Sequence, residues 1–266
     1  MEKPEYKTKL KVMKRIFILL SLFAITISGT SDIPCVEGCI CCRVYKAFIT
    51  NDMNIWKQGI ASKQNKFKAE GKTCDLYELT LAQYGLTAYY LGKENYDAAK
   101  KYLPILEKNI ELLIADKNYK SRGKALKGAM YGFKVALNPL KGVYLGTQSL
   151  DLINEAVITD PSNPTGWVEK GNAKYHMPAI FGGSYEDAIT YYKKAIVLFE
   201  KQRKCIKCNW LYLNTLVWLA KSYDQDGKLS LAKQTYEKVL RVEPGFTWVK
   251  NELLPDIKKK IQEENR

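Results

Sequence analysis

The sequence predicts an all-α fold, an α-solenoid of about ten helices arranged as antiparallel hairpins. Three observations lead to this prediction. From Val44 onward, apolar residues recur with the 3.6-residue period of an amphipathic helix, and no segment alternates convincingly as a half-buried strand would. Proline and glycine fall between the periodic segments rather than inside them. Short links join neighbouring segments, and a hairpin motif recurs along the chain.

The periodic segments and their flanking residues set the predicted helix boundaries. The stretch ITDPSNP ends one helix, Pro178 and Pro244 end two others, and Gly227 lies in the turn of the last hairpin. Ser184, followed by Glu186 and Asp187, is typical of a helix N-cap with an acidic first turn. The predicted helices are 43–66, 75–91, 95–115, 121–137, 146–159, 164–176, 184–203, 209–225, 228–242 and 246–262.

The last hairpin, LVWLAKSYDQDGKLSLAKQTYEKVLRVEP, carries the clearest repeat signal. Its small residues Ala220 and Ala232 allow the two helices to approach closely. Tyr223 and Tyr236 are expected to fill the wedge between successive hairpins. Two further units follow the pattern less strictly, with core candidates Tyr90, Ala99, Trp167, Gly171, Ala188 and Tyr192. The pattern resembles the tetratricopeptide repeat over residues 76–244, most strongly at its C-terminal end.

One repeat turn, YHMPAIFGGSYEDA (175–188), is about five residues longer than the plain repeat and holds the only histidine of the chain. A catalytic His176 would need a nucleophile or carboxylate held against it, and the glycine pair lacks the lysine of a phosphate-binding loop. We therefore predict no catalytic residue. Instead, Pro178 ends the helix, Phe181 tucks under the loop as an apolar plug, and the glycines adopt positive φ.

This enlarged turn is the predicted contact site for a ligand or partner. An insertion in a repeat is exposed on one face, and this one is apolar. Tyr144, Tyr175 and Trp248 fit no repeat-core position as clearly as the other aromatic residues and could line a groove. The tentative contact residues of the turn are Tyr175, His176, Pro178, Phe181, Gly182 and Gly183.

The N-terminus has the layout of a secretory signal. Lys14 and Arg15 precede an apolar run from Ile16 to Ile27, and small residues follow at Gly29 and Ser31. The run is shorter than the roughly 20 residues that span a bilayer, so no transmembrane anchor is expected after cleavage. The predicted organisation is a signal peptide at 1–31, a Cys-rich segment at 32–43 and a helical-repeat domain at 44–266. We predict an exported protein of the periplasm or cell surface, with Met1 or Met13 as its start and a lipid anchor left open.

Seven cysteines need an account in an exported chain. Disulfides are the default in an oxidising compartment, and the odd number leaves at least one thiol over. Cys205 and Cys208 form a C-x-x-C pair and are the predicted disulfide candidates. Zinc binding and thioredoxin-like chemistry are weaker alternatives, because the other spacings match no common zinc pattern and no strand precedes the pair. No metal site and no cofactor are predicted.

The formal net charge is +14, of which residues 1–31 carry +4. The remaining basic residues are spread along helical segments, without an Arg-rich arm, an RNA-binding aromatic box or zinc-finger spacing. Solvated helix faces explain this distribution, and nucleic acid is an unlikely partner.

The order of GAMYGFKVAL (128–137), DPSNP (160–164), the Pro178–Phe181–Gly182–Gly183 insertion and EPGFTWVKNEL (243–253) resembles a group of exported tetratricopeptide proteins from Bacteroidetes-type bacteria. That group is similar to the T component of TRAP transporters. The resemblance implies a periplasmic helical scaffold that binds a partner protein and passes a small, lipophilic ligand through a groove. The Cys-rich segment has no place in that pattern.

The predicted function is an exported, non-enzymatic scaffold that binds a partner protein or peptide in the cell envelope. The alternative is a periplasmic solute-transport accessory protein that binds or passes a small lipophilic ligand. A hydrolase or redox enzyme ranks third. The oligomeric state is left open.

Overall fold

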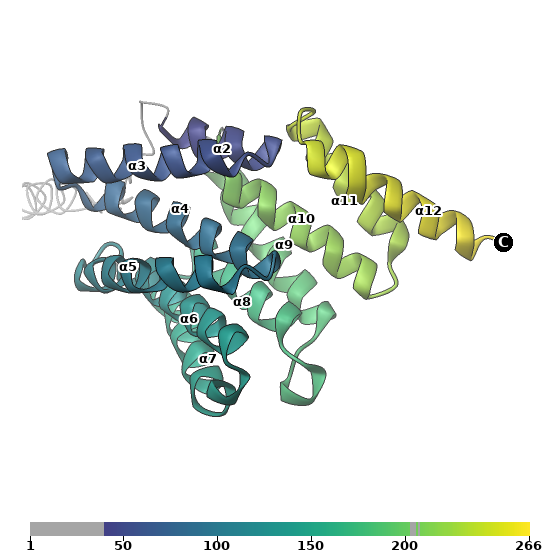
Figure 1. Cartoon of the computed structure of the whole chain (residues 1–266). Helices are drawn as coiled ribbons and strands as arrows, with labels where there is room; N and C mark the ends of the chain where they lie inside the picture. The colour runs from purple at the N-terminus through teal and green to yellow at the C-terminus, as the bar shows by residue number, and fades with distance from the viewer. Residues whose placement is uncertain (1–39, 203–205, 207) are drawn as a thin grey trace, which may run out of the picture. The chain divides into compact units, whose positions relative to one another are not determined.

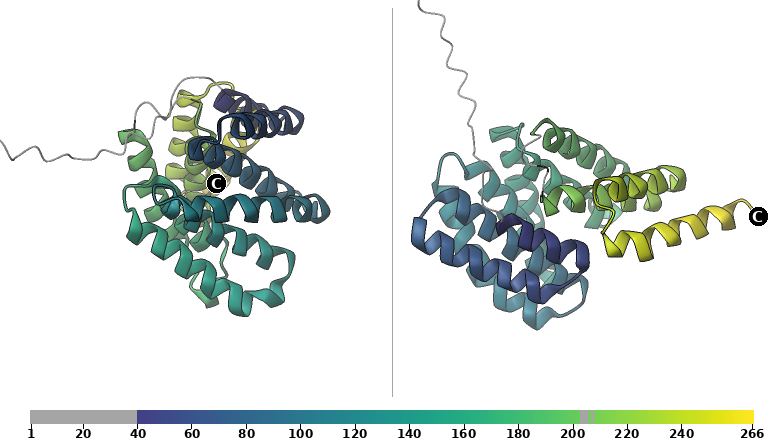
Figure 2. Two further views of the ribbon diagram at one scale, coloured as in Figure 1. Left: turned by 90° about the vertical axis from the view of Figure 1, so that its left-hand side faces the viewer. Right: turned by 90° about the horizontal axis from the view of Figure 1, so that it is seen from above.

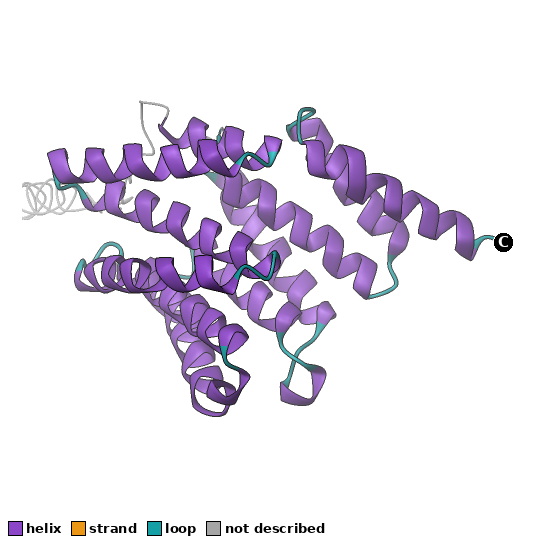
Figure 3. Cartoon of the chain, in the orientation of Figure 1, coloured by secondary structure: helices purple, strands orange, loops and turns teal. Residues whose placement is uncertain are grey.

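The computed structural model describes residues 40–266, except 203–205 and 207 (Figure 1). The predicted signal peptide at 1–31 lies outside the described residues, as does most of the Cys-rich segment. Every regular element within the described part of the chain is helical, as Figure 3 shows, which confirms the all-α prediction. None of these described helices has the length and apolar character needed to cross a bilayer.

Consecutive helices pack as antiparallel hairpins, consistent with the predicted α-solenoid. A π-helical segment, Val249–Leu253, leads into the last helix, and two short 3-10 turns, η1 and η2, lie inside the hairpins at Pro139–Lys141 and Ala179–Phe181. The described part contains eleven α-helices: α2 Ile40–Thr50, α3 Met53–Glu70, α4 Thr73–Gly92, α5 Tyr96–Ala115, α6 Lys120–Leu137, α7 Gly142–Thr159, α8 Pro164–His176, α9 Tyr185–Lys201, α10 Trp210–Gln225, α11 Leu229–Val242 and α12 Leu254–Glu264.

The prediction of one continuous helix over 43–66 is wrong, because the helix is interrupted there and the segment forms α2 and α3. Asn51 has a left-handed backbone with φ of 57°, a conformation that asparagine tolerates better than most residues. Asp52 then caps α3, and its carboxylate accepts from the N–H groups of Asn54 and Ile55 at 2.9 and 3.1 Å. The Asn-Asp pair is therefore a helix stop followed by a helix start. The first helix begins at Ile40, inside the Cys-rich segment.

Small residues allow the helix pairs to cross closely. Ala220 and Ala232 are fully buried, and a Cβ added at Gly171 would lie 2.6 Å from the Tyr192 ring. Such an approach excludes any larger side chain at Gly171 unless the ring shifts. Of the ten repeat-core candidates, seven are buried: Ala99, Gly171, Ala188, Tyr192, Ala220, Ala232 and Tyr236. The other three, Tyr90, Trp167 and Tyr223, are half-buried.

The first hairpin, α2–α3, packs against elements far along the chain. The rings of Trp56 and Trp210 meet edge-on with centroids 5.1 Å apart, and those of Phe48 and Phe246 lie 4.9 Å apart. The Trp56 indole N–H donates to the Ala82 carbonyl at 2.9 Å, so the buried ring has its polar group satisfied. In a simple solenoid each hairpin contacts only its neighbours. Here the N-terminal hairpin also contacts the C-terminal one.

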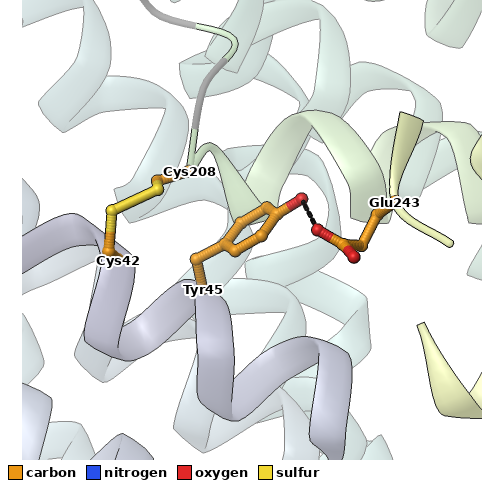
Figure 4. Close-up of a disulfide and its surroundings, with 4 residues drawn as sticks. All are labelled: Cys42, Tyr45, Cys208 and Glu243. Carbon is orange, nitrogen blue, oxygen red and sulfur yellow. Dashed lines mark hydrogen bonds between the residues drawn. A yellow bond between two sulfur atoms is a disulfide. The ribbon is translucent and has the colours of Figure 1, made fainter. Parts of the chain in front are cut away.

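A disulfide and a hydrogen bond strengthen this long-range contact (Figure 4). Cys42 on α2 is bonded to Cys208, 166 residues later, just before α10. The Tyr45 hydroxyl donates to the Glu243 carboxylate at 2.9 Å. Cys208, one of the two predicted disulfide candidates, is thus in a disulfide, and its partner, which the sequence left open, is Cys42. Cys205 itself lies outside the described residues. Sequence spacing could not reveal this partner, because the fold brings α2 to α10.

Residues of helix α4 also contact α8 and α10, which belong to later hairpins. The Tyr77 and Thr165 hydroxyls are 2.8 Å apart, and the Tyr84 hydroxyl donates to the Glu169 carboxylate at 3.1 Å. A Cβ on Gly85 of α4 would lie 2.7 Å from the Trp210 ring. These contacts connect α4 to two hairpins further along the chain.

We expect the Cys42→Ser/Cys208→Ser double variant to lose stability. Closing a loop of this length restricts the unfolded chain, and a native disulfide of this kind contributes about 2–5 kcal/mol. Urea unfolding of both proteins under oxidising conditions measures the difference. An unchanged free energy of unfolding would show that the disulfide does not hold the two ends together.

Candidate functional site

The enlarged turn between α8 and α9 is a compact hydrogen-bonded loop. The backbone N–H groups of Phe181 and Gly183 donate to the Pro178 carbonyl at 2.9 and 3.1 Å. Gly182 has φ of 95°, which favours glycine. Gly183 is required for a different reason, because a Cβ there would lie 1.8 Å from the Met177 carbonyl oxygen. Positive φ was predicted for both glycines and is found only at Gly182.

Both ends of the loop are fastened to the helices that flank it. The Ser184 hydroxyl caps α9 and accepts from the Asp187 N–H at 3.1 Å, as predicted. The Lys174 ammonium donates to the Gly182 carbonyl at 2.9 Å and forms an ion pair with Asp187 at 3.0 Å. These bonds define the path of the loop without any help from a buried side chain.

The prediction that Phe181 plugs the loop is wrong. Its side chain is 70% exposed, and that of Ile180 is 86% exposed. The backbone at Gly183 lies directly against the Met177 carbonyl, so backbone closes this part of the turn instead of a side chain. The 3-10 turn η2 therefore presents both apolar side chains to solvent.

The predicted contact residues separate into two places. Pro178, Phe181, Gly182 and Gly183 form the turn, whereas Tyr175 and His176 belong to a cluster of rings. The Trp218 ring on α10 contacts both, with centroids 4.9 Å from Tyr175 and 4.9 Å from His176, edge-on in each case. Tyr185 at the start of α9 contacts Tyr175 at 5.4 Å.

A lysine extends this cluster towards the C-terminal segment. The Lys221 ammonium lies 4.8 Å from the centre of the Trp218 ring and 5.6 Å from that of Trp248. Both distances suit cation–π attraction. We call the surface formed by Tyr175, His176, Trp218, Lys221 and Trp248 the aromatic face. It draws residues from α8, α10 and the segment after α11, and all five side chains remain at least partly accessible.

The aromatic face disfavours extra positive charge. Burial among neighbouring groups lowers the pKa of Lys221 below its usual value, and Asp224 partly opposes this. Although His176 retains exposed surface, crowding by protein atoms and then the Lys221 charge lower its pKa to about 4. Within the described residues Lys221 has no carboxylate ion pair; Asp224 is paired with Lys260 at 2.8 Å. An anionic group brought to this face would therefore be attracted to Lys221.

His176 provides a direct test, because it is the only histidine of the chain. We expect its imidazole NMR signals to titrate well below pH 6.5, as the neutral ring is favoured. Trp218→Ala opens the site to water and should raise the pKa towards 6.5. Identical titration curves near pH 6.5 for both proteins would contradict the described packing.

A second group of polar side chains is buried between α4, α8 and α9, and no sequence pattern indicated it. Glu169 is 1% exposed, and its Oε2 accepts from the Tyr84 hydroxyl and from the Asn172 amide at 3.1 and 3.0 Å. The Tyr192 hydroxyl donates to the Asn172 carbonyl oxygen at 2.7 Å. Oε1 of Glu169 has no hydrogen-bond partner among the described residues. Burial raises the pKa of Glu169 to about 7, against the effect of the two donors.

The raised pKa sets the direction of a pH effect. The folded state binds a proton on Glu169 between pH 4.5 and about 7 that the unfolded state has lost, so stability falls as pH rises through this range. Glu169→Gln keeps the hydrogen bonds without the charge. The free energy of unfolding of this variant, minus that of the wild type, should increase by about 2–3 kcal/mol from pH 5 to pH 8. Denaturant titrations at both pH values measure it.

The exposed Glu186 is the matched control for this substitution. Glu186→Gln should leave the difference from wild type nearly constant over the same pH range. If Glu169→Gln behaves like Glu186→Gln, the carboxyl is hydrated in solution and the buried network is not as described.

The described residues contain no group of three or more His, Cys, Asp or Glu side chains placed to hold a metal ion. Two open hollows flank the α10–α11 turn and the end of α12, lined by residues within 224–231 and 260–265. Neither includes a predicted contact residue. Cys74 is a free thiol and is partly exposed.

Comparison with known proteins supports the repeat assignment at one end of the chain. A family model described as "Tetratricopeptide repeat" matches residues 213–246, which span most of the α10–α11 hairpin. This confirms the resemblance for the C-terminal unit, where the sequence pattern is clearest. The matched segment contains Trp218 and Lys221 of the aromatic face.

No curated protein matches the chain. Among solved structures, a HusA haemophore from Porphyromonas gingivalis is similar, with a TM-score of 0.48 and 14% sequence identity. The match covers 69% of this chain and 93% of the other. At this score and identity, we draw nothing about function from it.

Sequence reasoning singled out Tyr175, His176 and Trp248, but it missed Trp218 and Lys221. Trp218 lies two residues before the small crossing residue Ala220, so it points away from the partner helix of its own hairpin. A large aromatic residue at such a position, followed by Lys at i+3, is a signal that could have identified the face.

Proposed function

We propose that the protein is an exported, non-enzymatic scaffold that binds a partner protein or peptide in the cell envelope through the aromatic face. The observation that supports this most is the position of Trp218. Its ring contacts Tyr175 and His176 edge-on, and the Lys221 ammonium lies over it. Rigid aromatic rings that remain accessible are typical anchors of protein interfaces. The tetratricopeptide match to this hairpin favours the same role.

The chemistry of the face favours one kind of partner. A segment that binds here would place an apolar or aromatic side chain against Trp218 and a carboxylate near Lys221. Because the lowered pKa of Lys221 reflects poor hydration of its charge, a carboxylate would replace lost water contacts.

Export is part of the proposal and has one structural support. Disulfides persist in oxidising compartments, and the Cys42–Cys208 disulfide joins α2 to the segment just before α10. The signal-like segment at 1–31 agrees with this location. The finer similarity to TRAP T components remains a prediction.

The alternative, a solute-transport accessory protein for a small lipophilic ligand, has less support. An apolar pocket beside Phe181 would favour this alternative, whereas the Phe181 side chain is 70% exposed. Small molecules extracted from the purified protein and identified by mass spectrometry would test this alternative directly.

The test of the scaffold role is a pull-down from the envelope fraction of the source cells, with Trp218→Ala, Lys221→Glu and Trp167→Ala proteins beside the wild type. Trp167 is the matched control, because it also lies near a lysine, 5.9 Å from Lys170, but outside the aromatic face. We expect the Trp218 and Lys221 variants to lose a specific partner at least about tenfold, as removal of an interface anchor costs roughly 2 kcal/mol.

Equal capture by the Trp218 and Trp167 variants would refute the assignment of the aromatic face. A His176→Ala protein separates binding from chemistry. If the His176→Ala protein retains the partner and no turnover of a bound molecule depends on His176, the enzyme hypothesis has no candidate catalytic residue left.

A further inference from the structure

The turns inside the hairpins lie at one edge of the repeat array. In successive hairpins the first helices run in the same direction, so their C-terminal ends point to the same side. Helices α6 and α7 pack against α8, and Figures 1 and 2 show the α6–α7 and α8–α9 turns on a common side of these helices. Residues far apart in sequence thus share one edge.

The α4–α5 and α10–α11 turns are short and polar, whereas the α6–α7 and α8–α9 turns are longer and apolar. The α4–α5 turn is Lys93-Glu94-Asn95, and the α10–α11 turn is Asp226-Gly227-Lys228. The two central turns, 138–144 and 177–185, are called the apolar turns here. They carry exposed large side chains: Leu140 86%, Val143 89%, Tyr144 54%, Ile180 86%, Phe181 70% and Tyr185 38%.

The apolar turns share a construction that lowers the cost of leaving water. Each has a proline at its start, Pro139 or Pro178, which contributes no N–H group. The N–H groups of Leu140 and Lys141 donate to Asn138 at 3.2 and 3.0 Å. In the other turn the N–H groups of residues 181–184 all donate to backbone oxygens. An unpaired N–H moved out of water is costly, and these are already paired.

The apolar turns also carry little charge. Residues 138–150 contain one charged residue, Lys141, and residues 177–185 contain none. Tyr144 and Tyr185 add the amphipathic rings that are common at the level of lipid headgroups. Residues 32–266 carry a formal charge of +10, the +14 of the whole chain less the +4 of residues 1–31, which favours an anionic surface.

We propose that the two apolar turns dock side by side into the headgroup region of a phospholipid bilayer, which holds the protein at a membrane surface. Side chains that protrude from a convex turn with 70–89% exposure can enter a fluid interface without a matching cavity. A protein partner would need two pockets at the correct spacing. The bilayer is therefore the occupant that these features fit best.

Hydroxyl-radical footprinting of the full chain with vesicles tests the docking directly. The apolar run at 16–27 could by itself hold the full chain on vesicles, so the readout must report on the turns. We expect oxidation of Leu140, Tyr144, Ile180 and Phe181 to fall several-fold with vesicles of phosphatidylethanolamine and phosphatidylglycerol. Ile158, 80% exposed at the opposite end of α7, should keep its rate.

Substitutions in one apolar turn test whether the other turn still enters the membrane surface. Ile180→Ser/Phe181→Ser should abolish vesicle protection of Leu140 and Tyr144, since both turns enter the same surface together. Ile158→Ser should leave that protection intact. All substituted positions are exposed, and circular dichroism checks that each variant stays folded.

Three outcomes would overturn the proposal. Oxidation rates that do not change with vesicles would show that the turns stay in water. Protection that appears without vesicles and grows with protein concentration would show that a second copy covers the turns. Protection by a soluble envelope protein, but not by vesicles, would assign them to a protein partner.

Discussion

The edge-on contact of Trp56 with Trp210, beside the glycine at position 85, is the contact on which the arrangement of the described chain depends. It joins α3 and α4 to α10, a helix that a nearest-neighbour repeat would keep apart from them. A side chain at residue 85 would collide with both indoles, so only glycine allows α4 to lie this close. The Cys42–Cys208 disulfide and the Tyr45–Glu243 hydrogen bond reinforce the same junction.

This junction changes where the protein can bind. Side chains of α4 contact α8 and α10, helices of later hairpins, and so take up surface that an open repeat would leave between them. Two accessible surfaces are the aromatic face and the edge formed by the apolar turns. These two surfaces differ in chemistry, since one combines rings with a poorly hydrated lysine and the other has protruding aliphatic side chains. The two surfaces adjoin, because Tyr185 of the apolar turns contacts Tyr175 of the aromatic face at 5.4 Å.

The buried Glu169 is a cost of the same arrangement. Packing α4 onto α8 encloses a carboxyl that has one oxygen paired and one unpaired, and its pKa rises to about 7. Burying such a group lowers stability unless it is protonated. The network of Tyr84, Asn172 and Tyr192 offsets part of that cost and sets the register of α4 against α8 and α9.

The sequence by itself determined the helices, most of their ends and the C-terminal repeat, because period, caps and small crossing residues act over a few neighbouring positions. Ser184 and Gly182 behave as local rules require. The helix break at Asn51–Asp52 also has a local signal in the sequence, but we did not predict it. Only tertiary structure decided that Cys208 pairs with Cys42, that Phe181 faces solvent and that Trp218 meets Tyr175 and His176. These depend on contacts between helices distant in sequence, and a local pattern carries no information about which distant surfaces will meet.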